Sequence, residues 1–277
     1  MEGTRRSRTA QAVVAQRAVL AGLGVIDEPY AEQMLDRSMA AIAWGAQRAP
    51  RLLRARWVTL AGCAAAVQWF DAQVGTAIDE GVGQIVTIGA GYDTRAWRFA
   101  REGVQFFELD MGTTQRDKMR RAPGPGPVFV EADLLCDDAA DVVVDAGLDP
   151  SQPALFVLEG LTMYLSEQVV RRQLTGLAAL GAAGSGIVAD FYPPPSAGTS
   201  QNRRQLLLQR VARVGSGEGF QLQIERSRAA ELFEQSGWTV DQTVGFREVA
   251  KRLVSPRAGL PIDSVNNGKS LIAAHLD

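Results

Sequence analysis

From residue 84 onward, short apolar runs alternate with helix-like segments, and this alternation restricts the possible folds more than any other feature. The apolar runs occupy residues 85–88, 104–109, 128–130, 154–158, 186–190, 238–244 and 269–275. Helix-like segments separate most of them, near 111–121, 137–146, 166–181 and 226–236. Short apolar strands alternating with helices are typical of βαβ units, whose parallel strands are buried on both faces. The sequence therefore predicts an α/β fold with a doubly wound, mostly parallel, seven-stranded sheet.

The rest of the chain is predicted to add helices around this sheet within a single domain. Residues 1–80 are the N-terminal helical part, with helices near 7–21, 28–48 and 52–80, and residues 81–192 form the core. Three prolines from Pro193 and a polar helical segment at 199–214 indicate a cap insertion over the sheet, spanning 193–225. Residues 226–277 complete the sheet.

Charge and composition exclude several classes of protein. A net charge of −2 gives no basic field for nucleic acid or an anionic membrane. Polar residues interrupt the apolar stretch after the twin arginine Arg5-Arg6, and no apolar run of about 18 residues follows elsewhere. Cys63 and Cys136 lie far apart, and His275 is the only histidine. We therefore expect a cytoplasmic protein without disulfide, metal site or histidine-based catalysis.

Polar and glycine positions follow four successive predicted strands. The first strand runs into Gly89-Ala-Gly91, where a tight turn lets a ligand approach the backbone. Asp110 ends the second strand, where a carboxylate can accept both hydroxyls of a ribose. Asp133 after the third strand suits an adenine amino group, although a helix cap or a solvated loop explains it equally well. Glu159 follows the fourth strand. Because parallel strands share one carboxyl edge, these positions predict one ligand site.

The glycine turn favours one nucleotide ligand over another. Dinucleotide sites carry Gly-x-Gly-x-x-Gly, but Thr94 stands at the third glycine position and Asp93 precedes it. A carboxylate there would repel a pyrophosphate, whereas adenosine with a short, cationic, non-phosphorylated tail suits the site. The expected cofactor is therefore S-adenosylmethionine. A nicotinamide oxidoreductase and a cofactor-binding protein without methyl transfer are the competing interpretations.

Several motifs resemble the leucine carboxyl methyltransferase family, with its bacterial branch that methylates small molecules such as polyketide acids. They are AVVAQRA at 12–18, EPYA at 28–31, QIVTIGAGYDTRAWR at 84–98, FELD at 107–110 and EGLTMYL at 159–165. The resemblance covers residues 8–192 and continues more faintly to the end. It implies a Rossmann-like class I methyltransferase fold.

The resemblance also implies roles for individual residues. Gly89 and Gly91 would line the methionine part of the cofactor and Asp110 would hold the ribose. Asp133 and Leu134 would frame the adenine. Glu159 would lie near the cofactor amino group, and Arg17 near its carboxylate, with a salt-bridged helix residue as the alternative for Arg17. The family's second arginine has no clear counterpart, with Arg54 and Arg56 as candidates.

Methyl transfer from a sulfonium depends mainly on alignment, because the cofactor supplies the electrophile. We therefore assign no catalytic residue. A carboxylate acceptor is already ionised at neutral pH, whereas a phenol or enol usually needs a base. With a single histidine, the sequence favours O-methylation of a carboxylate on a small acidic metabolite, and a phenol or enol is the alternative. The candidates for contact with the acceptor are Met163, Tyr164, Phe191 and Tyr192, although core packing explains these residues equally well. The cap could add Arg203, Arg204, Arg210 and Arg213, although a solvated helix face explains these arginines better.

Overall fold

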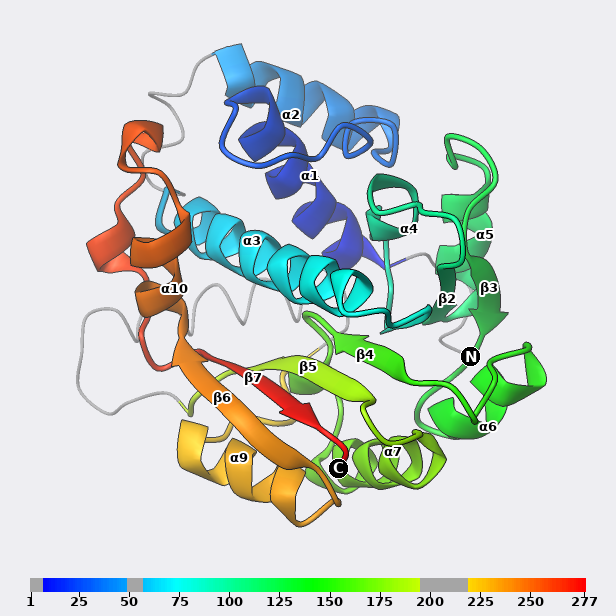
Figure 1. The fold of residues 1–277 in the computed structure, drawn as a ribbon. Coiled ribbons are helices and arrows are strands. Elements are labelled where there is room, and N and C mark those ends of the chain that lie inside the picture. Colours follow the sequence, from blue (N-terminus) through cyan, green and yellow to red (C-terminus); the bar gives the residue numbers. More distant parts are fainter. Residues whose placement is uncertain (1–6, 49–56, 195–218) are drawn as a thin grey trace.

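A computed structural model describes residues 7–48, 57–194 and 219–277. Its centre is a seven-stranded sheet with the strand order β3-β2-β1-β4-β5-β7-β6 (Figure 1). The strands are β1 (Gln84–Ile88), β2 (Gln105–Asp110), β3 (Val128–Glu131), β4 (Ala154–Leu158), β5 (Gly186–Phe191), β6 (Thr239–Gly245) and β7 (Ser270–His275). Only β7 runs against its neighbours, β5 and β6, so the predicted mostly parallel sheet is confirmed.

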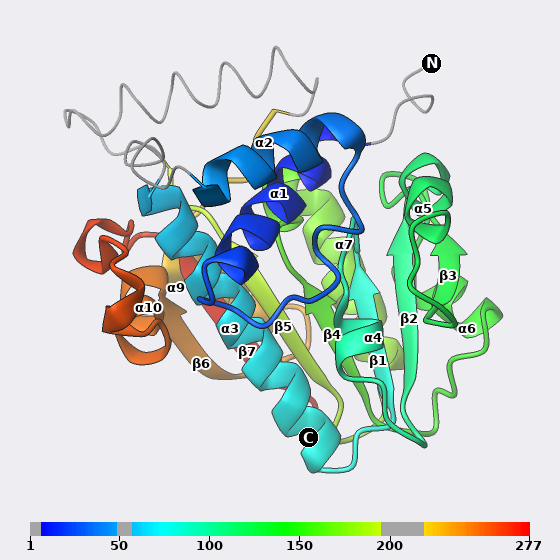
Figure 2. The same cartoon turned by 90° about the horizontal axis from the view of Figure 1, so that it is seen from above.

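Helices cover both faces of the sheet. In Figures 1 and 2 the N-terminal helices and α10 lie on one face, whereas α6, α7 and α9 lie on the other. The helices of the first face are α1 (Arg8–Gly22), α2 (Arg37–Arg48), α3 (Trp57–Asp79) and α10 (Phe246–Leu253). Those of the second face are α6 (Ala139–Asp145), α7 (Glu167–Leu180) and α9 (Arg226–Glu234). The short α4 (Arg95–Arg98) follows β1, and α5 (Gly112–Met119) packs beside β3.

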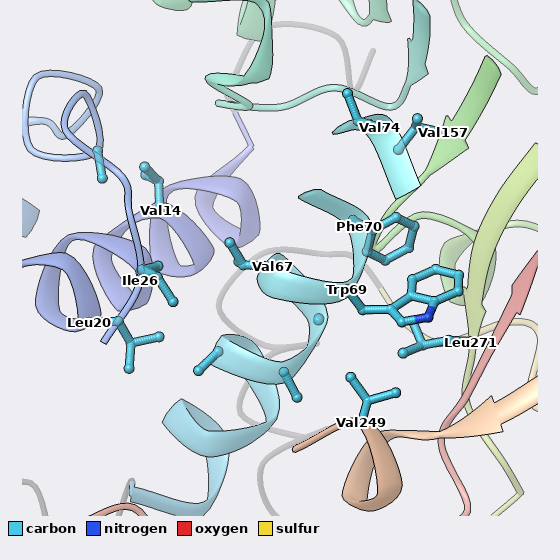
Figure 3. Packing of buried hydrophobic residues seen from close by; sticks show 14 of the residues in the cluster. Val14, Leu20, Ile26, Val67, Trp69, Phe70, Val74, Val157, Val249 and Leu271 are labelled. Carbon is cyan, nitrogen blue, oxygen red and sulfur yellow. The ribbon is translucent and has the colours of Figure 1, made fainter. Parts of the chain in front are cut away.

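Two apolar clusters, one on each face, hold these layers together. Ile85 of β1 belongs to the cluster under α3, whereas Val86 and Ile88 belong to the cluster under α7. Figure 3 shows the first cluster, in which Trp69 and Phe70 of α3 lie toward the sheet and α10, whereas Val67 lies toward α1. Neighbouring residues of one strand thus point to opposite faces, and both faces are buried, which explains why the strands are nearly continuous apolar runs.

The structure corrects two sequence expectations. The helix expected at 28–48 begins only at Arg37, because the Asp36 carboxylate accepts the Met39 N–H at 2.9 Å and ends the preceding turns. Helix α10 was not expected at all. The cap segment 199–214, with its four arginines, lies outside the described residues, as do Arg54 and Arg56. Among the helices that are described, none is long and apolar enough to cross a bilayer.

Candidate cofactor site

The turn after β1 is built from two glycines with positive φ. Gly89 has φ 69° and Gly91 has φ 52°, a region that side-chain-bearing residues rarely adopt. A Cβ atom at Gly89 would lie 2.7 Å from Cδ1 of Leu161, which belongs to the turn after β4. At Gly91 it would lie 3.2 Å from Cβ of Ala10 on α1. The glycines therefore let three segments meet at the carboxyl edge of the sheet.

Asp110 fixes this turn to the end of β2. Its Oδ2 accepts the Gly91 N–H at 2.5 Å and its Oδ1 accepts the Met111 N–H at 2.7 Å. The N–H groups of Gly89 and Ala90 both donate to the Leu109 carbonyl, at 2.8 and 3.0 Å. Asp110 is half-buried. The structure thus brings the two glycines and Asp110 together, as the sequence predicts.

The turn after β3 places Asp133 and Leu134 at the same edge. The Asp133 Oδ1 accepts the Leu135 N–H at 3.1 Å, and its own N–H donates to Asp137 at 2.7 Å. The Leu134 carbonyl accepts hydrogen bonds from Arg172, at 2.7 Å, and from Gln173 on α7. This turn is therefore held firmly from within and from α7, with Asp133 in a local capping contact.

Arg17 and Glu159 meet directly. The Arg17 Nη2 donates to Glu159 Oε1 at 2.7 Å, which joins α1 to the end of β4. The Arg17 Nη1 also lies 3.4 Å from Glu28 Oε1. Arg17 is only 5% exposed and lies in ion pairs, as the salt-bridged alternative describes, and its role toward the cofactor carboxylate stays a prediction.

Sequence reasoning missed the larger ionic cluster around this pair. Arg95 is fully buried and lies 2.8 Å from Glu159 Oε2, 2.5 Å from Asp93 Oδ2 and 2.7 Å from Asp71 Oδ1. With Arg17 and Arg98 the cluster holds three guanidinium groups; its carboxylates are Glu28, Asp71, Asp93 and Glu159. If all are ionised, one negative charge remains, which suits a ligand with a net positive charge.

The cluster also revises the argument from Asp93. Burial opposes its ionisation, but the Arg95 and Arg17 guanidinium groups outweigh burial and hold the pKa of Asp93 below its usual range. Asp93 is therefore ionised, but the neighbouring guanidinium groups offset its charge. It repels an anion less than the sequence alone suggests. The signal for Arg95 was present in the motif at 84–98, but its partners are far apart in the chain.

Of the acceptor-side candidates, the structure groups Tyr164 and Tyr192 and sets Phe191 apart. The rings of Tyr164 and Tyr192 both contact Phe220, with centroids 5.6 and 5.4 Å away. Phe191 is 1% exposed and packs on Phe233 of α9, in the core of the other face. Met163 is 3% exposed, and its carbonyl accepts the Gln221 N–H at 2.7 Å. Core packing therefore describes Phe191, and Met163 supports the loop that carries Phe220.

The only histidine lies at the opposite end of the sheet. His275 pairs with Gly186, where β5 begins, whereas the polar cluster follows the strand ends. Its Nδ1 lies 2.9 Å from Asp241. Within the described residues, no group of three histidine, cysteine or acidic side chains is placed to hold a metal ion.

A seven-stranded sheet in this order, with its polar cluster at the carboxyl edge, defines an S-adenosylmethionine-dependent methyltransferase fold. The model of the family described as leucine carboxyl methyltransferase matches residues 8–178, more than half of the chain. The chain belongs to the leucine carboxyl methyltransferase family, and S-adenosylmethionine is its cofactor.

Relatives agree with this membership. A protein of Mycobacterium avium, named for S-adenosyl-L-methionine-dependent methyl transfer, is 27% identical over 85% of this chain and 82% of its own. A protein of the same name from Mycobacteroides abscessus is 30% identical over 76% of this chain and 73% of its own. The chain is thus a methyltransferase, which removes the nicotinamide oxidoreductase as an alternative.

Solved structures share the fold. A DUF574-family protein from Streptomyces avermitilis aligns over 100% of both chains with a TM-score of 0.61 and 17% identity. A protein from Thermobifida fusca, named as a methyltransferase, aligns over 95% of this chain and 94% of its own with a TM-score of 0.59, also at 17% identity. At this identity the likeness concerns the architecture alone.

The residues present fit S-adenosylmethionine. Arg17 Nε and Arg95 Nη2 are buried without a hydrogen-bond partner, so the cluster keeps donors for a ligand carboxylate. The glycine turn leaves the backbone open to close approach, and Asp110 offers carboxylate oxygens beside it.

Proposed function

We propose that this methyltransferase transfers the methyl group of S-adenosylmethionine to an oxygen of an ionised carboxylate on a small acidic metabolite of the polyketide type. The position of His275 carries the proposal. The sole imidazole lies a full strand length from the strand-end cluster, at the far end of β5 and β7. A carboxylate acceptor needs no base at neutral pH, which matches a site without an imidazole.

The cofactor would be held by the predicted residues in the arrangement described above. Gly89 and Gly91 would line its methionine part, Asp110 its ribose, and Asp133 with Leu134 its adenine. Arg17 and Glu159 would face the carboxylate and the amino group. Since they are already paired with each other at 2.7 Å, we expect them to act as one preorganised unit.

The reaction conserves charge without a proton transfer. The cofactor supplies an electrophilic methyl group on a sulfonium. A carboxylate oxygen of the acceptor would form the new C–O bond while the S–C bond breaks and its electron pair stays on sulfur. A cation and an anion thereby become a neutral ester and a neutral thioether. The task of the protein is to align the reacting atoms and exclude water.

One observation favours methylation of a phenol or enol as the second candidate. Asp190 is the second-last residue of β5 beside this edge, is 3% exposed, and accepts the Gly160 N–H at 2.7 Å. Burial raises the pKa of Asp190 to about 7. A carboxylate with that pKa is suited to act as a general base for a hydroxyl acceptor.

Incubation with methyl-labelled S-adenosylmethionine and a panel of aromatic and polyketide acids and phenols separates these candidates. We expect labelled product from acids only, and we expect mild alkaline hydrolysis to remove the label, because esters hydrolyse and ethers do not. Mass spectrometry before and after hydrolysis provides the measurement. A labelled product that is stable to base would refute ester formation and support methylation of a phenol or enol to an ether.

The acceptor is proposed to be a free small molecule, with no nucleic-acid or membrane partner, and the proposed compartment is the cytoplasm. The net charge of −2 and the free thiols of Cys63 and Cys136 support this proposal.

A further inference from the structure

Four aromatic side chains from separate segments gather beyond the ends of β4 and β5. Tyr192 lies 5.4 Å from Phe220 and 6.5 Å from Phe246, measured between ring centroids. Tyr164 lies 5.6 Å from Phe220, with the two ring planes at 78°. Tyr164, Tyr192 and Phe220 are partly exposed rather than sealed in the core. We call Tyr164, Tyr192, Phe220 and Phe246 the aromatic group.

A lysine ammonium lies on this aromatic group. The Nζ of Lys269 is 4.0 Å from the ring centroid of Tyr192 and 5.4 Å from that of Phe246. Such distances are within the range of cation–π contacts. Lys269 immediately precedes β7, whose first residue, Ser270, pairs with Phe191 at the end of β5. The ammonium therefore lies at the same edge of the sheet as the cofactor cluster.

Lys269 differs from the other two lysines of the chain, because no carboxylate among the described residues forms a close ion pair with it. Lys118 is buried against the Glu108 carboxylate, and Lys251 lies 2.9 Å from Asp263. Lys269 has no carboxylate within 4.0 Å of its Nζ in the part of the chain that the structure describes. Lys269 is half-buried, and a half-buried cation on an aromatic surface with no ion-pair contact at a ligand-binding edge is placed to receive a ligand anion.

The charge state of Lys269 agrees with this role. Burial lowers the pKa of Lys269 to about 8, against the attraction of the nearby Asp190 carboxylate. The side chain is therefore mostly protonated at pH 7. Its attraction for an anion would also be stronger than in open water, because the surroundings are aromatic.

We propose that Lys269 binds the carboxylate of the methyl acceptor, and that Tyr164, Tyr192 and Phe220 contact a planar aromatic ring attached to it. The acceptor class is then an aromatic carboxylic acid, a statement that rests on the proposed function. One carboxylate oxygen pairs with the ammonium, which leaves the second oxygen free to attack the methyl group. A phenolate has a single oxygen, which would have to contact the ammonium and attack the methyl group at the same time.

The test measures binding, with 2-naphthoate as the acid probe and 2-naphthamide as its neutral, isosteric control. Each is titrated calorimetrically into protein saturated with S-adenosylhomocysteine. The proteins are wild type, Lys269→Met, Lys269→Arg and Lys251→Met, the last a matched control at the exposed lysine paired with Asp263. Titration of S-adenosylhomocysteine alone reports whether the cofactor site is intact in each variant.

We expect the wild type to bind the acid at least about tenfold more tightly than the amide, because a charge-assisted contact contributes that much. Lys269→Met should abolish this preference and Lys269→Arg should keep most of it. Lys251→Met should behave like wild type. Equal affinity of wild type for acid and amide, or a preference that survives Lys269→Met, would overturn the proposal. So would a loss of S-adenosylhomocysteine affinity in Lys269→Met with the acid preference intact, since the lysine would then serve the cofactor.

A second measurement needs no variant. Acylation of the three lysines of the wild-type protein, mapped by mass spectrometry, should show that 2-naphthoate protects Lys269 and leaves Lys251 reactive. Acylation of Lys269 unaffected by 2-naphthoate would overturn the proposal even if Lys269→Met did not fold.

Neither binding measurement depends on methyl transfer, so together with the product assay they distinguish failure of this proposal from failure of the proposed function. Acid binding that depends on Lys269, in a protein that makes only base-stable products, would support the role of Lys269 and refute ester formation. Ester formation by Lys269→Met with the same KM as wild type would refute the role of Lys269 in acid binding and support the proposed ester formation.

Discussion

Replacement of Asp110 tests the centre of the candidate cofactor site. Its two carboxylate oxygens already accept the N–H groups of Gly91, at 2.5 Å, and Met111, at 2.7 Å. A carboxylate offers about four lone-pair sites, so the group can accept ribose hydroxyls in addition to backbone N–H groups. We predict that Asp110→Asn weakens the binding of S-adenosylhomocysteine and that Asp110→Ala weakens it further, while both proteins fold.

The magnitude follows from the hydrogen bonds lost. A hydrogen bond to a charged group contributes about 1.5–3 kcal/mol, so loss of one raises the dissociation constant about 10- to 150-fold. Asp110→Asn keeps one acceptor oxygen, so its dissociation constant for S-adenosylhomocysteine should rise by a factor in this range. Alanine keeps none, and its dissociation constant should rise by about 100-fold or more. The stability cost should be only about 1–2 kcal/mol, because Asp110 is half-buried and water can reach the released N–H groups.

Calorimetric titration with S-adenosylhomocysteine and urea unfolding of each variant provide the two measurements. Glu131→Gln is the matched control, because Glu131 lies opposite Asp110 in the β2–β3 register but is exposed and pairs with Arg116. Its affinity should equal that of wild type. An Asp110→Ala protein with wild-type affinity, or an affinity loss explained by the unfolded fraction alone, would refute the assignment of the ribose to Asp110.

Two further predictions concern the buried charges. Burial raises the pKa of Asp190 from 3.8 to about 7, so the folded protein binds this proton more tightly than the unfolded chain does. The resulting stabilisation is fully present below about pH 4 and is lost as the pH rises through about 7. The melting temperature of Asp190→Asn should therefore change less between pH 4 and pH 8 than that of wild type. Parallel curves of melting temperature against pH would contradict the raised pKa of Asp190. Arg95→Met should lower the free energy of unfolding by about 3–5 kcal/mol, because buried carboxylates lose their partner. Arg101→Met, which breaks an exposed pair with Asp79, should cost less than about 1 kcal/mol in the same urea assay, and equal costs would contradict the argument from burial.

Most of the sheet could be predicted from the sequence, because strands buried on both faces are nearly continuous apolar runs. The run at 154–158 has the same bounds as β4, and the other runs differ from their strands by a residue or two. The helix boundaries were less predictable. Phe246, Val249, Ala250 and Leu253 repeat at helical spacing, but the stretch is only two turns long and directly follows β6.

The candidate site could be predicted only where a motif marks a strand end. Gly89, Gly91, Asp110 and Glu159 each follow an apolar run, and the structure places them at one edge. Arg95 and Lys269 carry no such local mark. Their significance depends on Asp71 and Tyr192, which are distant in the chain and become neighbours only after the sheet and α3 have packed.

The two halves of the site therefore have different origins in the chain. All candidate cofactor residues lie within 8–178, the part that the family model matches, together with Tyr164 of the aromatic group. The other residues on the acceptor side, Tyr192, Phe220, Phe246 and Lys269, lie beyond it. The antiparallel direction of β7 joins these halves. Because β7 runs against β5, its first residue lies where the parallel strands end, which carries Lys269 to Tyr192 and to the cofactor edge. A parallel last strand would place the same lysine at the opposite edge, beside the position that His275 now occupies. Most residues proposed to bind the acceptor thus lie in segments that can change without disturbing the residues proposed to bind the cofactor.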